Sequence, residues 1–280
     1  MKLTSIFWMV LLVLGLFFGL IYFNTWPFRD LMNWKVKREV SMGKAQGMSL
    51  LGNNMQLNAE NTWELTLTAK AGQHFWHPQV AVWIEDKHGN FLETLMVTNA
   101  TAKGWFYGGR TRDNFKSFDA QSVGDGANYR RVDALPVWSH SRGVRYQDGL
   151  FVPPANQPLP DGMSGATPST DFTVNQPIKN LPDHFSVFLE MNVAFDENEY
   201  FSEYDYPDDE VYHNGTGQLG QPSIVYRADF EEGTGSAQMM KLIGHGHHSA
   251  KHGDINPDLS TLTTALHILD WVVVERKEVY

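Results

Sequence analysis

The sequence contains no cysteine among its 280 residues. A chain without thiols forms no disulfide, binds no zinc or iron–sulfur cluster through cysteine, and has no thiol nucleophile. The absence does not fix the compartment, because exported proteins also fold without disulfides. Any redox or metal chemistry must therefore depend on other side chains or on a bound cofactor.

Basic residues are also scarce, with 22 Lys and Arg against 32 Asp and Glu and a net charge of −10. This balance argues against a nucleic-acid partner, because phosphate backbones are bound by a basic face. Hydrophobic residues make up 42% of the chain and its mean hydropathy is −0.34. The composition therefore indicates a globular domain with a sizeable core and excludes a polytopic membrane protein.

Long apolar runs are limited to residues 6–23. At about 1.5 Å per residue in a helix, this run nearly crosses a bilayer core of about 30 Å. Trp8 lies near one end and Tyr22 and Trp26 near the other, where interfacial aromatic residues are typical. No small-residue cleavage site follows, so we predict a retained transmembrane anchor over residues 1–26 rather than a cleaved signal peptide.

The charges around this run bear on its orientation. Only Lys2 and the α-amino group precede it, whereas several basic residues follow it, namely Arg29, Lys35, Lys37, Arg38 and Lys44. The positive-inside rule alone would leave the C-terminal domain in the cytoplasm. We nevertheless predict a single-pass inner-membrane protein with a periplasmic domain, on the strength of the motif and resemblance given below.

Beyond a connector at residues 27–50, the pattern is that of β-strands. The clearest pair is 80–85 and 91–97, joined by the turn residues 86–90 as a hairpin. Other expected elements are strands at 63–68, 185–193, 223–230, 239–243 and 269–275 and a short helix within 258–267. Residues 98–182 are rich in Gly, Pro, Asn and Ser, and so long an irregular stretch is usually functional. We therefore predict an immunoglobulin-like β-sandwich with long loops over residues 51–280.

The irregular stretch contains the sequence Asp161-Gly-Met-Ser-Gly-Ala-Thr167. It resembles the covalent FMN-attachment sequence Asp-x-x-(Ser/Thr)-Gly-Ala-Thr of FMN-binding subunits in sodium-pumping and related membrane electron-transfer complexes. The resemblance implies that a dedicated transferase joins FMN by a phosphodiester to the hydroxyl of Thr167 and recognises Asp161, Ser164, Gly165 and Ala166. Pro168 departs from the usual continuation in a helix or strand, and the alternative is a turn-rich loop with no cofactor.

A second resemblance covers residues 78–98. The segment Ala81-Val-Trp-Ile-Glu-Asp-Lys-His-Gly-Asn-Phe-Leu-Glu-Thr-Leu95 is similar to an exported bacterial family, the domain of unknown function 2271. The likeness is fainter at 135–138 and 165–167. Members look like immunoglobulin-type sandwiches and tend to be encoded near flavin transferases and membrane redox proteins, which implies partners of those kinds. The family has no established catalytic residues.

Histidines gather near the C-terminal end, where His245, His247, His248 and His252 precede Asp254. Neutral imidazole is a good ligand for zinc, copper or iron, so a transition-metal site is a second interpretation. The alternative is a solvated, glycine-flexible loop whose histidines bind backbone groups. A separate pair, His74 and His77, precedes the first hairpin strand.

Other clusters are weaker. Residues 196–210 carry eight carboxylates, which calcium favours, but their spacing matches no EF-hand and a solvated acidic loop is the simpler interpretation. Ser139 and His140 are adjacent without a Gly-x-Ser-x-Gly elbow, which does not make a catalytic triad. Trp105 and Tyr107, in a glycine-rich segment, are candidates for stacking on a flavin or a sugar.

Three functions follow from these features. The first is a membrane-anchored flavoprotein that carries FMN and relays electrons, in which the cofactor supplies the redox chemistry. The second is a non-catalytic binding module of a membrane complex, and the third is a metal-binding protein that uses the histidine-rich loop. An electron-transfer or binding protein is favoured over an enzyme with its own substrate.

Overall fold

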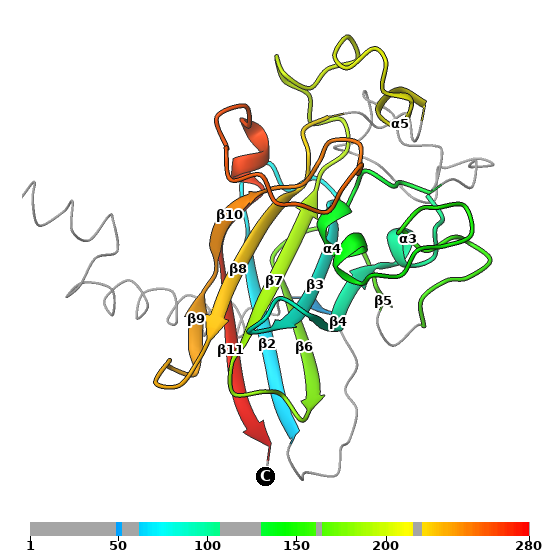
Figure 1. Cartoon of the computed structure of the whole chain (residues 1–280). Helices are drawn as coiled ribbons and strands as arrows, with labels where there is room; N and C mark the ends of the chain where they lie inside the picture. The colour runs from blue at the N-terminus through cyan, green and yellow to red at the C-terminus, as the bar shows by residue number, and fades with distance from the viewer. Residues whose placement is uncertain (1–48, 52–61, 107–129, 161–163, 215–219, 280) are drawn as a thin grey trace, which may run out of the picture. The chain divides into compact units, whose positions relative to one another are not determined.

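Eleven strands in the described residues form two packed sheets, so the protein is mainly β. The computed structural model describes residues 49–51, 62–106, 130–160, 164–214 and 220–279 (Figure 1). One sheet has five strands in the order β1 (Ser49–Leu51), β6 (Phe172–Lys179), β2 (Thr62–Ala71), β11 (Leu269–Val279) and β9 (Ala237–Met239). Strand β11 pairs antiparallel with β2 over nearly its whole length, from Leu269 opposite Ala71 to Val279 opposite Thr62.

The second sheet has six strands, and the candidate sites lie at its ends. Their order is β10 (Lys241–His245), β8 (Ile224–Phe230), β7 (Phe185–Asn192), β3 (Gln79–Asp86), β4 (Phe91–Thr98) and β5 (Ser164–Gly165). The pairs are antiparallel, except that the short edge strand β5 runs parallel to β4. The chain changes sheets at Met240, which is buried and separates β9 from β10.

The main core lies between the two sheets. Alternate residues of each strand point inward, as the period-2 pattern requires, and β7 contributes Phe185, Val187, Leu189 and Met191. Each fully buried aliphatic or aromatic side chain contributes roughly 1.5–3 kcal/mol relative to exposure. The two-sheet β-sandwich expected from the sequence is therefore present.

A second, smaller core covers the outer face of the six-stranded sheet. The opposite residues of the same strands, including Trp83 and Phe188, pack against residues 134–138. The rings of Trp83 and Phe188 stack with their centroids 5.1 Å apart. The short helix α4 (Pro136–Ser141) lies over β7 and β3 in Figure 1 and places the buried Trp138 in this core. Strands β3 and β7 are consequently buried on both faces over most of their length.

One carboxylate is buried in that outer layer. Glu190 of β7 accepts hydrogen bonds from the backbone N–H of Val137 and Trp138, at 3.1 and 2.7 Å, and from the Ser223 hydroxyl at 2.5 Å. These contacts connect α4 and Ser223, the residue before β8, to β7. Burial raises the pKa of Glu190 to about 7, although all three hydrogen bonds lower it.

The hairpin predicted at 80–85 and 91–97 is confirmed as β3 and β4. Its turn is closed by Asp86, whose carboxylate accepts hydrogen bonds from the N–H groups of His88 and Asn90. The side-chain and backbone hydrogen bonds from Asn90 hold the pKa of Asp86 below its usual value. Gly89 has φ +80°, a left-handed conformation that glycine adopts at little cost.

One local prediction was wrong. The composition places residues 172–179 in the long irregular stretch, but they form β6, in which Pro177 pairs with Glu64 of β2. Proline has no N–H to donate, so its presence masked the strand pattern. The short helix predicted within 258–267 is present as the 3-10 helix η3 (Thr264–His267).

The predicted anchor at 1–26 lies outside the described residues, as does the connector at 27–50 apart from Ser49 and Leu50 of β1. Within the part of the chain that the structure describes, no helix is both long and apolar enough to cross a membrane.

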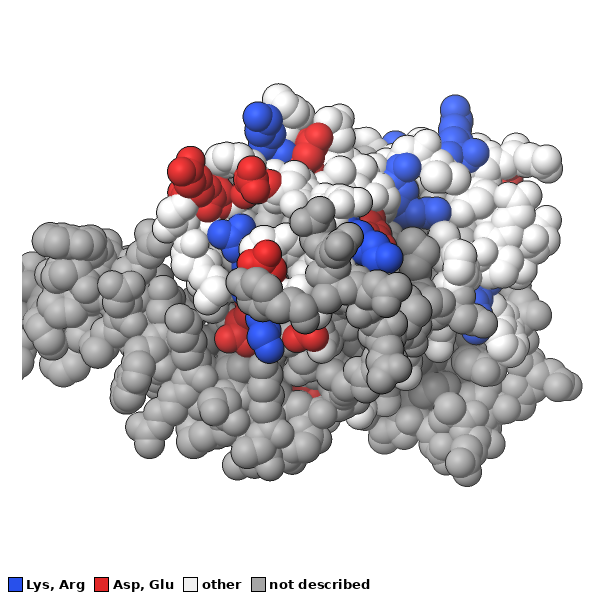
Figure 2. All heavy atoms as spheres, turned by 90° about the horizontal axis from the view of Figure 1, so that it is seen from below, with Lys and Arg blue, Asp and Glu red and all other residues white. Residues whose placement is uncertain are grey.

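Viewed from below, the described surface shows acidic and basic side chains interspersed (Figure 2).

Candidate functional site

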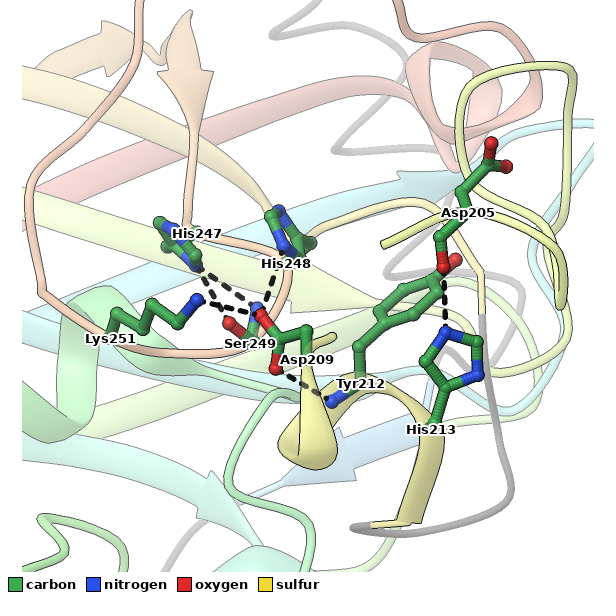
Figure 3. Close-up of polar contacts among 8 residues, drawn as sticks. All are labelled: Asp205, Asp209, Tyr212, His213, His247, His248, Ser249 and Lys251. Carbon is green, nitrogen blue, oxygen red and sulfur yellow. Dashed lines mark hydrogen bonds and ion pairs between the residues drawn. The ribbon is translucent and has the colours of Figure 1, made fainter. Parts of the chain in front are cut away.

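Two loops that are distant in sequence meet beyond the end of the six-stranded sheet (Figure 3). We call residues 195–214 the acidic loop and residues 244–256 the histidine loop. Asp209 of the acidic loop joins them, because its Oδ2 lies 3.0 Å from Lys251 Nζ and 3.4 Å from His248 Nε2. The Tyr206 ring stacks on the His248 ring with a centroid distance of 3.8 Å. The acidic and histidine clusters of the sequence therefore form one site.

The sheet fixes the base of the histidine loop. His245 ends β10, and its backbone exchanges two 2.9 Å hydrogen bonds with Asn256, which closes the loop. The next residue, Gly246, donates its N–H to the Ser223 carbonyl at 2.8 Å. A Cβ on Gly246 would lie 2.6 Å from Pro136 Cγ, so only glycine lets the histidine loop lie this close to α4.

Asp209 is buried, at 6% exposure, and holds the acidic loop in place. Its Oδ1 accepts the Tyr212 N–H at 3.1 Å at the start of α5 (Glu210–Asn214), which satisfies a backbone donor that the helix cannot. Burial raises the pKa of Asp209, but hydrogen bonds from Ser249, Tyr212 and Lys251 outweigh burial and hold it well below its usual value. Asp209 is therefore an anion at neutral pH.

The imidazole rings pack on one another. The His247 and His248 rings stack at 4.3 Å between centroids, and the His252 ring meets His247 edge-on at 4.6 Å. Burial, followed by the neighbouring His248 and His252, lowers the pKa of His247 to about 4. Burial also lowers the pKa of His248, although Asp209 opposes this effect. At neutral pH both rings are uncharged.

The rings border a cavity of about 390 Å³, which is large enough for an ion or a small organic ligand. Its walls combine histidine, aromatic and acidic side chains, among them Phe201, Tyr206, His245, His247, His248, His252, Asp254 and Asp258. All four histidines predicted as metal ligands therefore line the same space. The other sequence pair does not, since His74 faces His267 at 6.3 Å between ring centroids.

Three residues of the acidic and histidine loops have left-handed backbone conformations, and one of them, Tyr206, lines the cavity. Phe195, Tyr206 and Ala250 have φ values of 59°, 51° and 55°, in the left-handed region that non-glycine residues seldom adopt. Each such residue costs on the order of 1–3 kcal/mol, and such residues cluster at functional sites. Each loop thus includes at least one residue whose unfavourable backbone conformation must be held by its surroundings.

The predicted metal centre is not assembled in this arrangement. Among the residues that the structure describes, no three histidine or acidic side chains are placed so that they could hold a metal ion together. The acidic side chains are also engaged locally. Asp205, for example, accepts hydrogen bonds from the N–H and hydroxyl of Ser202, both at 2.7 Å.

The flavin-attachment motif lies at the other edge of the same sheet. Ser164 and Gly165 form β5 and pair with Val97 and Thr98 of β4. Ala166 is exposed, Thr167 is partly exposed and the following Pro168 is buried. Asp161, the first residue of the motif, lies outside the described residues. The Thr167 position thus follows an edge strand and is partly open to solvent.

The adjacent Ser139 and His140 belong to α4 and stabilise it. The Ser139 hydroxyl donates to the Pro136 carbonyl at 3.1 Å, and His140 Nδ1 lies 2.8 Å from the same oxygen. Ser139 is fully buried, and His140 stacks on Phe151 at 4.1 Å between centroids. Neither residue is arranged as a nucleophile and base.

Glu190 and the linking role of Asp209 are not among the residues predicted from the sequence. The available signal for Glu190 is that it is the one charged residue in the mostly apolar strand β7. No comparable signal distinguished Asp209 from the seven other carboxylates at 196–210.

Comparison with models of known protein families gives no match, and a search of curated proteins finds no relative.

Proposed function

We propose that this chain is a membrane-anchored, extracytoplasmic electron-transfer protein that carries FMN on Thr167. The motif from Asp161 to Thr167 and the resemblance to domain of unknown function 2271 are the reasons for the proposal. The observation that carries it is the placement of Thr167, partly exposed and directly after the exposed Ala166. A modifying enzyme needs such access to the acceptor hydroxyl.

The surroundings of the motif fit a tethered flavin. A Cβ on Gly165 would lie 3.2 Å from Met96 Cε, so glycine lets the motif backbone lie close against β4. Helix α3 (Asn99–Ala102) contacts β5, and the Ala102 carbonyl accepts the Leu159 N–H at 2.9 Å. Trp105, 39% exposed, follows α3 closely in the chain. Its indole supplies an aromatic face on which a flavin ring linked at Thr167 could stack.

When bound, FMN would supply the electron-accepting and electron-donating chemistry. The chain would fix the phosphate through Thr167 Oγ and shield one ring face with Trp105. The partners that follow are an FMN transferase, which forms the phosphodiester, and membrane redox proteins, which exchange electrons with the flavin. The N-terminal anchor would keep the domain beside those partners.

Peptide mass spectrometry after co-expression with a competent FMN transferase tests this function. We expect the peptide that contains Thr167 to gain the mass of one FMN less one water. The gain should disappear in Thr167→Ala and persist in Thr170→Ala, which removes an exposed hydroxyl three residues away. Absence of flavin from the wild-type chain, or attachment to a peptide without Thr167, would overturn the proposal.

A second candidate is a non-catalytic binding module of a membrane complex. The cavity of about 390 Å³ between the acidic and histidine loops favours it, because a cavity lined by aromatic and polar groups suits a small ligand. The immunoglobulin-like type is likewise a proposal, supported by the two packed sheets. The first and last long strands, β2 and β11, are neighbours in one sheet. In an antibody domain the first and last strands, A and G, belong to different sheets.

A further inference from the structure

The largely buried side chain of His245 has one ring nitrogen without a hydrogen-bond partner. His245 borders the cavity between the acidic and histidine loops, although the residue is only 7% exposed. Its Nδ1 lies 2.7 Å from the Gly246 carbonyl oxygen, and a carbonyl only accepts, so Nδ1 carries the proton of the neutral ring. Nε2 is then an acceptor, to which none of the described residues donates a hydrogen bond. A donor in the cavity would satisfy this nitrogen.

The charges around the cavity favour a cation. The carboxylates that border it are those of Asp254 and Asp258, and both residues are exposed. Hydrogen bonds from Ser260 hold the pKa of Asp258 below its usual value, so Asp258 is an anion at neutral pH. Within the described ranges, no lysine or arginine borders the cavity, and Lys251 of the histidine loop lies 3.0 Å from Asp209 instead.

Aromatic side chains border the same cavity. Phe201 and Tyr206 belong to the acidic loop, and the uncharged rings of His247 and His248 lie beside them. Rings of this kind bind the hydrocarbon part of a ligand. The cavity of about 390 Å³ has room for a small organic molecule. It therefore suits a ligand that combines a charged donor group with a short apolar body.

We propose that this cavity binds a small organic cation of the primary alkylammonium class. The ammonium group donates a hydrogen bond to His245 Nε2, and the carboxylates of Asp254 and Asp258 attract its charge. The alkyl chain packs on the rings of Phe201 and Tyr206. An ammonium group has three donors and no acceptor, which matches a lining that offers one unused acceptor and two anions.

The cation site does not rest on the flavin proposal, and it gives a ligand class to the binding module named as the second candidate function. It lies beyond β10, whereas the flavin motif begins at β5, on the opposite edge of the six-stranded sheet. Five strand spacings of about 4.8 Å separate the two edge strands. Thr167→Ala, which removes the proposed flavin acceptor, is therefore expected to bind the cation as wild type does.

The test is calorimetric titration of the full-length chain in detergent with butylammonium, in phosphate buffer at pH 7.5. We expect one butylammonium per chain. The neutral analogue 1-butanol should bind at least tenfold more weakly, and the anion butyrate should not bind. His245→Phe keeps a ring but removes Nε2, so it should lower affinity about tenfold or more, as expected for the loss of a hydrogen bond to a charged group.

A charge-matched pair of double variants tests the role of the carboxylates. Asp254→Asn/Asp258→Asn should lower affinity at least fivefold, since one charge pair at 4 Å in water contributes about that factor. The control Asp183→Asn/Glu232→Gln removes the same charge and should stay within twofold of wild type. Its two residues are exposed and lie beyond the other end of β7 and β8.

Thermal melting identifies any variant that fails to fold. Asp254 and Asp258 are exposed, so their substitution is expected to leave the fold intact and keeps the test decisive if His245→Phe does not fold. Failure of wild type to bind butylammonium, or equal affinity for 1-butanol, would overturn the proposal. So would equal losses in the two double variants, because the attraction would then come from the overall charge of the chain.

Discussion

The pH dependence of stability at Glu190 offers a quantitative test of the outer layer. This carboxylate is fully buried and its pKa rises from 4.5 to about 7 on folding, chiefly because of burial. Between these two values the folded state binds the proton more tightly than the unfolded state, so unfolding free energy falls as pH rises. The difference, at about 1.4 kcal/mol per pH unit, corresponds to about 3 kcal/mol.

The informative substitution is Glu190→Gln, which cannot ionise. Its amide oxygen can accept from one backbone N–H of α4, but its amide nitrogen cannot accept from the other, as the carboxylate accepts from both Val137 and Trp138. We expect the variant to be less stable than wild type at pH 5, by about 1–3 kcal/mol for the unsatisfied donor. Its deficit should shrink or reverse by pH 8, where the wild-type chain carries a buried charge.

Urea unfolding followed by tryptophan fluorescence at pH 5, 6, 7 and 8 measures this difference. The control is Glu232→Gln, at an exposed glutamate, which should follow the wild-type curve at every pH. Parallel pH profiles for wild type and Glu190→Gln would show instead that Glu190 ionises in the folded protein as it does in the unfolded chain.

Two further substitutions test the supports of the candidate sites. Gly246→Ala should lower the free energy of unfolding by about 1–3 kcal/mol, because its Cβ would lie 2.6 Å from Pro136 Cγ. Thermal melting measures this loss. The control is Gly235→Ala, whose Cβ would lie 3.9 Å from its nearest neighbour. Trp138→Phe should cost about 1–3 kcal/mol in urea unfolding, because it removes the 3.0 Å hydrogen bond from the indole to Thr94 and leaves that hydroxyl buried. Unchanged stability in either variant would contradict the packing described here.

The hairpin β3–β4 could be predicted from sequence because its strands and turn carry mutually consistent signals. Asp86, Gly89 and Asn90 favour a tight turn, and apolar residues flank it. Strand β6 could not be predicted in this way, since Pro177 interrupts its pattern and only the partner β2 reveals its place. Pairing between distant strands is a tertiary property that local pattern does not encode.

The candidate site also combines features that the sequence predicts with features that only the tertiary structure reveals. The sequence identified the four histidines because they are close together in the chain, and the structure places them around one cavity. It did not predict that Asp209 meets His248, because that contact joins residues 39 positions apart through loop packing.

The proposed function depends most directly on the mass of the intact chain from its native host. The sequence corresponds to 31.8 kDa. We expect a species heavier than this by one FMN less one water, with the N-terminal apolar segment retained and flavin absorbance under denaturing conditions. An intact chain at the unmodified mass, without flavin absorbance, would contradict it.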